Sequence, residues 1–396
     1  MIELRGKNNI AKVFTNNIEE TAISQIIELC NQDFTKNSKI RIMSDCHAGA
    51  GCTIGTTMTI QDKIVPNLVG VDIGCGMYVV KLKEREINFK KLDDVIRKII
   101  PSGQNIRENK HDLINKIDLR ELKCFNHINY DRAVKSLGTL GGGNHFIEIN
   151  KDEENNLYLV IHSGSRYLGK QVAEYYQELG YKKLISNRDI KVNLINKLKK
   201  EGREKDIQEE LSKLPNTKIN KQLAYIEDID LNNYLHDMKI TQRYAELNRI
   251  AMGSEILKNM NLHVEESFTT IHNYIDIENN MLRKGAISAD KNEKVIIPMN
   301  MRDGSLICLG KGNEDWNKSA PHGAGRILSR SKANENILLK DFEETMKNVW
   351  TTSISQSTID ESPMAYKPMQ EIIDNIQDTV DVINIIKPLY NFKAGN

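Results

Sequence analysis

The sequence predicts an α+β protein built as one large domain, and three observations support this. The chain has 396 residues, of which 39% are hydrophobic and 28% charged, so it can bury a sizeable core and is not disordered overall. Short β-branched runs recur beside glycine-rich turns, whereas the charged stretch at about 168–260 has helical periodicity. No linker or repeat divides the chain, so we expect a single domain over residues 1–396.

Five apolar runs are predicted to be short β-strands because they are rich in β-branched or aromatic residues and lie next to glycine or polar turns. They are residues 77–82, 145–149, 157–163, 294–299 and 305–309. Mixed β-sheets with glycine-rich loops at the strand ends are therefore expected.

Two stretches are predicted to be helical. In the first, at about 168–260, four apolar residues keep the spacing of a buried helix face: Leu231, Tyr234, Leu235 and Met238. The second, at about 368–387, repeats that spacing with Ile372, Ile376, Val380 and Ile383.

Within the first stretch, residues 182–221 carry twelve Lys/Arg and six Asp/Glu. We interpret this segment as a solvated helical hairpin, with an arm that follows RNA phosphates as the alternative.

Charge and cysteine content exclude several classes of protein. The formal net charge is +1, so no overall positive field indicates a nucleic-acid partner. No run of about 18 apolar residues is present and the first residues do not form an apolar signal segment, so we expect no membrane partner. The six cysteines lack the spacing of a disulfide framework, which favours a reducing, cytoplasmic location.

A metal-binding group is predicted around Asp72 and Cys75, which are three residues apart between glycines that permit a tight turn. His145, His162, His272 and His322 each lie beside glycine, asparagine or serine in a loop or at a strand end. A thiolate with imidazoles favours zinc, and the carboxylate also admits manganese or iron.

Glycine-rich loops beside these histidines are suited to binding phosphate. Four glycines precede Asn144, and Arg166 and Arg326 follow the small residues that come after His162 and His322. Consecutive backbone N–H groups and an arginine fork bind phosphate oxygens well. We expect a helix to begin near Leu168 and another at Arg326. The residues thus predict a metal-dependent enzyme that acts on phosphates.

Eight motifs follow one another along the chain: DCHAGAGCTIGTT (45–57), VGVDIGCGM (69–77), LGTLGGGNHFIEI (137–149), HSGSR (162–166), HNY (272–274), RKGA (283–286), HGAGR (322–326) and PMAYK (363–367). With these motifs in this order, the chain closely resembles the RtcB family of RNA ligases from about residue 40 to the C-terminus.

The resemblance implies two Mn²⁺ ions that share the sulfur of Cys75. One ion would be completed by His162 and His272, and the other by Asp72 and His145. Manganese rests on the resemblance alone, since the ligand types themselves favoured zinc.

The resemblance also implies GTP as cofactor, with His322 as the nucleophile that becomes guanylylated and Asp45 orienting its imidazole. Arg166 and Arg326 correspond to the family's arginines in the HSGSR and HGAGR motifs. The implied nucleotide-binding set is Asn144, His145, Glu148, Asn300, Ser305, His322, Gly323, Ala324, Gly325 and Lys393.

The implied reaction joins RNA with a 3′-phosphate or 2′,3′-cyclic phosphate to RNA with a 5′-hydroxyl through an RNA-3′-pp-guanosine intermediate. An activating partner of the archease type is a further possibility that the family offers. Two alternatives stay open: a metal-dependent cyclic phosphodiesterase that does not ligate, and a non-catalytic factor that binds RNA ends.

Three departures from the family pattern affect the nucleotide and substrate contacts. Asn300 and Ser305 stand where many members have a serine pair, and the chain continues beyond Lys393 instead of ending in Lys-Gly. Tyr167 occupies a position where glycine is frequent, and we expect it to narrow the substrate channel.

Overall fold

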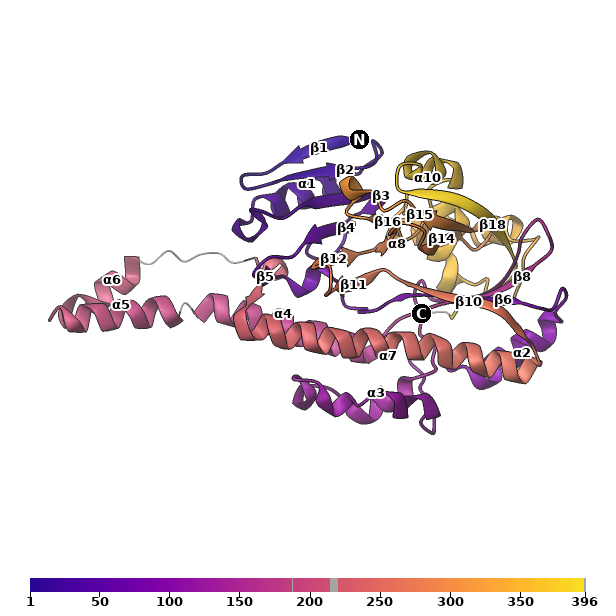
Figure 1. Ribbon diagram of the computed structural model, residues 1–396, viewed down its shortest axis with the longest axis horizontal. Coiled ribbons are helices and arrows are strands. Elements are labelled where there is room, and N and C mark those ends of the chain that lie inside the picture. Colours follow the sequence, from indigo (N-terminus) through magenta and orange to yellow (C-terminus); the bar gives the residue numbers. More distant parts are fainter. Residues whose placement is uncertain (187, 214–219, 395–396) are drawn as a thin grey trace.

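Two mixed β-sheets form the centre of the computed structural model, which describes residues 1–186, 188–213 and 220–394 (Figure 1). The first sheet has the order β1 (Ile2–Arg5), β2 (Ile10–Val13), β3 (Ile40–His47), β4 (Ile54–Thr59), β12 (Met281–Lys284) and β11 (Asn273–Asp276). The second has the order β10 (Val264–Ile271), β6 (Gly76–Leu82), β8 (Leu157–Ser163), β7 (Phe146–Lys151), β18 (Val380–Phe392), β15 (Gly304–Gly310) and β14 (Lys294–Asn300), with β17 (Trp350–Thr351) paired to β18. The α+β prediction is confirmed.

Two short pairs complete the strands described: β13 (Ala286–Ser288) with β16 (Ser319–Pro321), and β5 (Lys63–Ile64) with β9 (Ile226–Glu227). The α-helices of the body are α1 (Glu20–Cys30), α2 (Phe89–Ile99), α3 (Tyr130–Ser136), α4 (Arg166–Ser186), α7 (Asp228–Met260), α8 (Arg330–Asn336), α9 (Leu339–Thr345) and α10 (Met369–Ile376). None of the helices in the described part of the chain combines the length and apolar character needed to cross a bilayer.

The long helix α7 runs beneath both sheets, with α3 on its outer side (Figure 1). Its buried residues join two apolar clusters, one with α4 and the first sheet and one with α2 and the second sheet. Gly253 lets α7 lie close to strand β6, because a Cβ at residue 253 would stand 2.7 Å from the Tyr78 ring. A single helix thus connects the two cores.

The five predicted strands correspond to β6, β7, β8, β14 and β15, each within two residues of its predicted ends. The helical prediction for 168–260 is confirmed in outline by α4 and α7, and β9 is the one strand in the described part of this stretch. The helix expected near Leu168 begins at Arg166.

The helical prediction for 368–387 is wrong in its second half. Helix α10 ends at Ile376, and Val380 and Ile383 belong to strand β18. This segment is rich in β-branched residues and pairs with both β15 and β7, so sheet formation overrides the helical spacing. Pro388 would also have removed a helical hydrogen bond.

The helix expected at Arg326 is also absent from the described structure. The chain there turns through Gly325 at φ +74°, and Arg326 makes an isolated β-bridge with Tyr366. Helix α8 starts only at Arg330, where the Ser329 side chain accepts a hydrogen bond from the Lys332 backbone.

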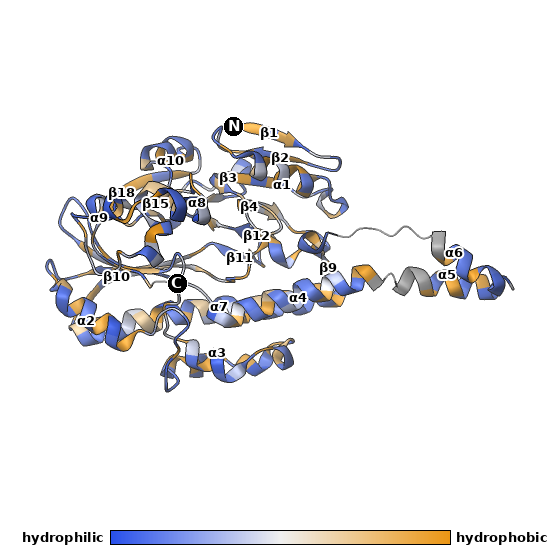
Figure 2. Ribbon diagram, turned by 180° about the vertical axis from the view of Figure 1, so that it is seen from behind, coloured by the Kyte–Doolittle hydropathy of each residue, from blue (hydrophilic) through white to orange (hydrophobic). Residues whose placement is uncertain are grey.

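The charged segment projects from the body as an arm, in line with α4 (Figures 1 and 2). Helices α5 (Arg188–Lys200) and α6 (Ile207–Lys213) pack on each other as a hairpin, which confirms that interpretation for the described residues. Arg203 forms ion pairs with Glu201 and Asp206, so basic side chains here are partly neutralised by acidic neighbours. Residues 187 and 214–219 of this segment lie outside the described residues.

Two buried polar side chains on α7 fasten the loops at the strand ends. Asn248 and Arg249 are no more than 1% exposed. The Arg249 guanidinium donates to the carbonyls of Gly74 (2.7 Å) and Ser163 (2.9 Å). Asn248 accepts from the backbone N–H groups of residues 138 and 139 and donates to the carbonyls of residues 139 and 164.

We predict that Asn248→Ala lowers the free energy of unfolding by about 3 kcal/mol, because it leaves several buried backbone groups without partners. Asn259→Ala, on the exposed part of the same helix, is the matched control and should change it by less than about 0.5 kcal/mol. Chemical denaturation monitored by circular dichroism measures both, and equal effects would contradict this role for Asn248.

Candidate metal and nucleotide site

One end of four neighbouring strands gathers the metal-ligating side chains. Cys75 immediately precedes β6, His145 precedes β7, His162 lies at the end of β8, and His272 follows β10. The register places Gly76 opposite both Ile271 and Ser163, and His162 opposite Phe146. Antiparallel pairing therefore brings four segments that are far apart in the sequence to the same edge.

These residues form two groups that share the Cys75 sulfur. One is Cys75 with His162 and His272, the other Cys75 with Asp72 and His145, and within each group the donor atoms lie within 4.8 Å of one another. All except Asp72 are buried. A thiolate, three imidazoles and a carboxylate fit divalent transition metals. The structure thus brings together all five predicted metal ligands.

Backbone carbonyls fix the imidazole tautomers in the form that binds metal. Nδ1 of His145 lies 2.9 Å from the Leu140 carbonyl, and Nδ1 of His162 lies 3.1 Å from the Asn144 carbonyl. A carbonyl can only accept, so each Nδ1 carries a proton, and a neutral ring then presents its Nε2 lone pair to a cation. Those Nε2 atoms lie 3.4 and 3.3 Å from the Cys75 sulfur.

Burial controls the charge of the donors. It lowers the pKa values of His162 and His272 well below the ordinary value, so both rings are neutral. Burial, and next the charge of Asp72, raise the pKa of the Cys75 thiol well above its ordinary value. A cation bound between these donors would offset the cost of ionising the Cys75 thiol, because a thiol that coordinates a metal ion loses its proton.

Asp72 is an ionised carboxylate. Burial acts to raise its pKa, but the hydrogen bond and the charge of His145 lower it to about 2. Its Oδ2 lies 2.9 Å from His145 Nε2, and its Oδ1 accepts from the Ser165 backbone N–H at 3.1 Å. Gly164 is required there, since a Cβ would stand 2.2 Å from the Asp72 carboxylate.

The predicted nucleophile lies beside this cluster. His322 follows β16, and its ring centroid is 4.8 Å from that of His272. Its Nδ1 lies 2.7 Å from Oδ2 of Asp45, which is fully buried on β3. The carboxylate therefore holds the proton on Nδ1 and leaves the Nε2 lone pair free, the arrangement that nucleophilic catalysis by histidine requires.

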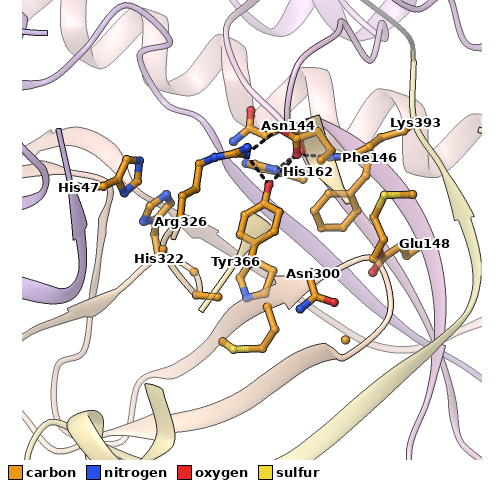
Figure 3. A pocket seen from close by; sticks show the side chains of 18 of the residues that line it. His47, Asn144, Phe146, Glu148, His162, Asn300, His322, Arg326, Tyr366 and Lys393 are labelled. Carbon is orange, nitrogen blue, oxygen red and sulfur yellow. Dashed lines mark hydrogen bonds and ion pairs between the residues drawn. The ribbon is translucent and has the colours of Figure 1, made fainter. Parts of the chain in front are cut away.

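A pocket of about 170 Å³ extends from His322 (Figure 3). His322 and His47 lie at one end and Phe146, Glu148 and Lys393 at the other, with Arg326 and Tyr366 between them. Its lining includes the predicted nucleotide contacts Asn144, Glu148, Asn300, His322, Gly323, Ala324, Gly325 and Lys393.

Three predicted contacts lie differently. His145 belongs to one of the two donor groups and is not among the residues that line this pocket. Ser305 is fully buried in β15 and is not among the residues that line this pocket. Asn300 lines it, but its amide is engaged in a turn with the backbone N–H groups of Arg302 and Asp303.

A buried carboxylate organises the far end of the pocket. Glu361 accepts from Lys393 at 2.6 Å and from Tyr366 at 2.7 Å, and it pairs with Arg330 and Arg326. Burial acts to raise its pKa, but the charges of Lys393 and Arg330 outweigh burial and hold it well below the usual range.

Arg166 lies in contact with His145, one of the predicted metal ligands. Its Nη1 lies 3.3 Å from His145 Nδ1, and its backbone has φ +58°, which is uncommon for a side-chain-bearing residue. Its guanidinium lies against Gly141, where a Cβ would stand 1.8 Å from Nη2.

Sequence reasoning missed several residues of this pocket, including His47, Phe146, Tyr366 and Glu361. His47 could have been found, because it is two residues from Asp45 on the same strand and so shares its face. Tyr366 lies in the quoted PMAYK motif, which received no assigned role. Glu361 carries no local signal, since its partners come from distant segments.

A family model described as "tRNA-splicing ligase RtcB" matches residues 25–394. The chain belongs to the RtcB family. The RNA-splicing ligase RtcB of Escherichia coli (strain K12) is 30% identical, and the match covers 99% of each chain. The tRNA-splicing ligase RtcB of Aeropyrum pernix is 26% identical over 89% of this chain and 87% of its own, and that of Methanococcus maripaludis is 25% identical over 96% and 93%. The resemblance read from the motifs is confirmed.

We predict that the protein binds Co²⁺ with a near-ultraviolet charge-transfer absorption from the Cys75 thiolate. Cys75→Ala should abolish that band and weaken metal binding at least tenfold, because both donor groups lose their shared ligand. Cys308→Ala, which removes another buried thiol, is the control and should keep the band. Retention of the band in Cys75→Ala would contradict the shared-sulfur site.

Proposed function

We propose that this protein is an RNA ligase that uses GTP and two Mn²⁺ ions to join RNA ends through a guanylylated His322. Membership of the RtcB family supports RNA ligation, and the buried Cys/His/Asp group supports a metal requirement. One observation carries the nucleophile assignment: His322, oriented by buried Asp45, lies in ring contact with a proposed metal ligand.

In the first step, Nε2 of His322 attacks the α-phosphorus of GTP. A phosphorus–nitrogen bond forms, the bond to the β-phosphate oxygen breaks, and pyrophosphate leaves. Asp45 holds the Nδ1 proton throughout and stabilises the positive charge that develops on the imidazole. The backbone of residues 323–325 follows His322, and Arg326 lies between the two ends of the pocket; both are suited to bind phosphate oxygens.

In the later steps, a 3′-phosphate oxygen of RNA attacks the guanylylated histidine and releases the imidazole, which gives RNA-3′-pp-guanosine. A 5′-hydroxyl then attacks the RNA phosphate, the new phosphodiester forms, and GMP leaves. A 2′,3′-cyclic phosphate end is first hydrolysed to the 3′-phosphate. Arg166, beside His145, is placed to hold the RNA phosphate in line.

Residues Asp72, Cys75, His145, His162 and His272 would hold the two ions, one in each donor group. When bound, divalent ions neutralise phosphate charge and hold the attacking and leaving oxygens.

The end of the pocket away from His322 suits guanine. Glu148 offers a carboxylate for the N1–H and N2–H donors, and Lys393 offers a donor for O6. The Phe146 ring, 5.8 Å from the Lys393 ammonium, offers an apolar face for stacking. Adenine lacks the donor pair, so the site favours GTP.

Two further properties belong to this proposal: a cytoplasmic location and an archease-like activating partner. The cyclic phosphodiesterase alternative would need the same metal ligands but not His322. The RNA-end-binding alternative relies on the charged arm and leaves the five converging metal donors without a role. We therefore favour the ligase.

We predict that incubation with α-labelled GTP and Mn²⁺ labels the protein covalently, and that His322→Ala abolishes the label. Asp45→Asn should slow labelling about a hundredfold, because the Nδ1 proton loses its anionic partner. His236→Ala, at a more exposed histidine, is the control. Turnover of a cyclic phosphate end without GTP, together with an unlabelled protein, would favour the phosphodiesterase instead.

We predict that affinity for GMP rises as the pH increases through about 7. Burial raises the pKa of Glu148 to about 7, so the group is protonated below that pH and must lose its proton before it accepts from guanine. Glu148→Gln should weaken binding about tenfold at high pH and flatten the profile. Calorimetry compares GMP affinity against pH in the native protein and in Glu148→Gln. The GMP phosphate titrates identically in both measurements, so a difference between the two profiles comes from Glu148. Parallel profiles would contradict the prediction.

A further inference from the structure

The active-site side chains form a line with the proposed guanylylation site at one end. The His322 ring lies 4.8 Å from His272, which lies 5.1 Å from His162, which lies 5.2 Å from His145. Arg166 follows at 3.3 Å from His145. The series thus runs from His322, in the nucleotide pocket, to Arg166, the arginine that the proposed function assigns to the RNA phosphate.

Exposed apolar side chains stand at this Arg166 end. Tyr167, next to Arg166, is 42% exposed, and Val71, next to Asp72, is 49% exposed. The two segments are joined by the hydrogen bond from the Ser165 backbone to Asp72.

Arg132 covers one face of the Tyr167 ring. Its guanidinium carbon lies 5.5 Å from the ring centroid, and its Nη2 donates to the Gln104 carbonyl at 3.0 Å. This anchoring fixes the arginine in place while the tyrosine stays partly exposed to solvent.

The loop that carries Gln104 is tied to the Arg166 side of the site. Gly103 donates to the carbonyl of Gly141, the residue against which the Arg166 guanidinium lies. An open hollow of about 590 Å³ begins beside this loop, and its lining includes Gln104, Gly142 and Lys393. Lys393 also lines the nucleotide pocket, so the two hollows meet at one side chain.

We propose that Tyr167 and Arg132 form a stacking platform for the terminal base of an RNA strand whose end phosphate or hydroxyl reaches Arg166. This inference rests on the proposed function, since it names a subsite for the same substrate. Aromatic rings and guanidinium planes stack on any base, so the platform binds single-stranded ends with little sequence preference. Tyr167 places that stack one residue from the arginine assigned to the RNA phosphate.

The test uses single-stranded oligoribonucleotides with 2-aminopurine as the terminal base, whose fluorescence is quenched by stacking. One carries the probe at a 3′-phosphate end, another at a 5′-hydroxyl end, and a third carries it internally. Binding and quenching are measured in Mn²⁺ buffer without GTP. RNA binding and quenching therefore test the platform even if the protein forms no covalent guanylate. Covalent labelling with α-labelled GTP tests the proposed function separately.

We expect terminal 2-aminopurine to be quenched at one or both ends and the internal probe to be quenched less. Tyr167→Ala should remove the quenching and weaken RNA affinity about tenfold, whereas Tyr167→Phe keeps the ring and should retain both. Arg132→Gln should weaken affinity by a smaller factor.

Tyr181→Ala is the matched control, because Tyr181 lies on the same helix and also faces a cation, Lys221, at 5.2 Å. It should change neither affinity nor quenching. Equal quenching in the native chain and Tyr167→Ala, or an equal loss of affinity in Tyr181→Ala, would overturn the platform. Quenching confined to one of the two ends identifies which RNA strand stacks there.

Discussion

The convergence of nitrogen and oxygen donors on the Cys75 sulfur is the constraint on which the rest of the structure depends. Three imidazoles and a carboxylate lie close to a buried thiol. Buried polar donors that face one another are costly unless they share a cation. The fold must therefore hold these side chains firmly from behind, and it does so through the strand ends and helix α7.

The support behind the donors is made mostly of backbone. The carbonyls of Leu140 and Asn144 fix two imidazole tautomers. Arg249, on α7, binds the carbonyls of Gly74 and Ser163, the residues just before Cys75 and just after His162. Hydrogen bonds to main-chain groups of this kind orient ligands more rigidly than side-chain pairs do, because the strands cannot move independently.

The sequence was sufficient for the parts of the site that local patterns encode. The metal ligands and His322 lie in short glycine-rich motifs at strand ends, so both their chemistry and their position could be predicted. Glu361 could not be predicted, because its role depends on three cations, Arg326, Arg330 and Lys393, that come from two other segments. The strand at Val380–Phe392 was predicted as a helix for a related reason: its conformation is set by β15 and β7 on either side, not by its own spacing.

The charge balance of the pocket indicates that, on the proposed function, binding of a triphosphate depends on bound metal ions. At the far end, Arg326, Arg330 and Lys393 are matched against Glu361 and Asp360, so they have little positive charge to spare for a triphosphate. Asp45 beside His322 and Asp72 beside His145 add negative charge, and Arg166 lies in contact with His145. A polyanion placed between these ends would meet too little protein charge to offset its desolvation. On the proposed function, divalent ions held by the donors around Cys75 would supply that positive charge, because these donors lie between His322 and Arg166.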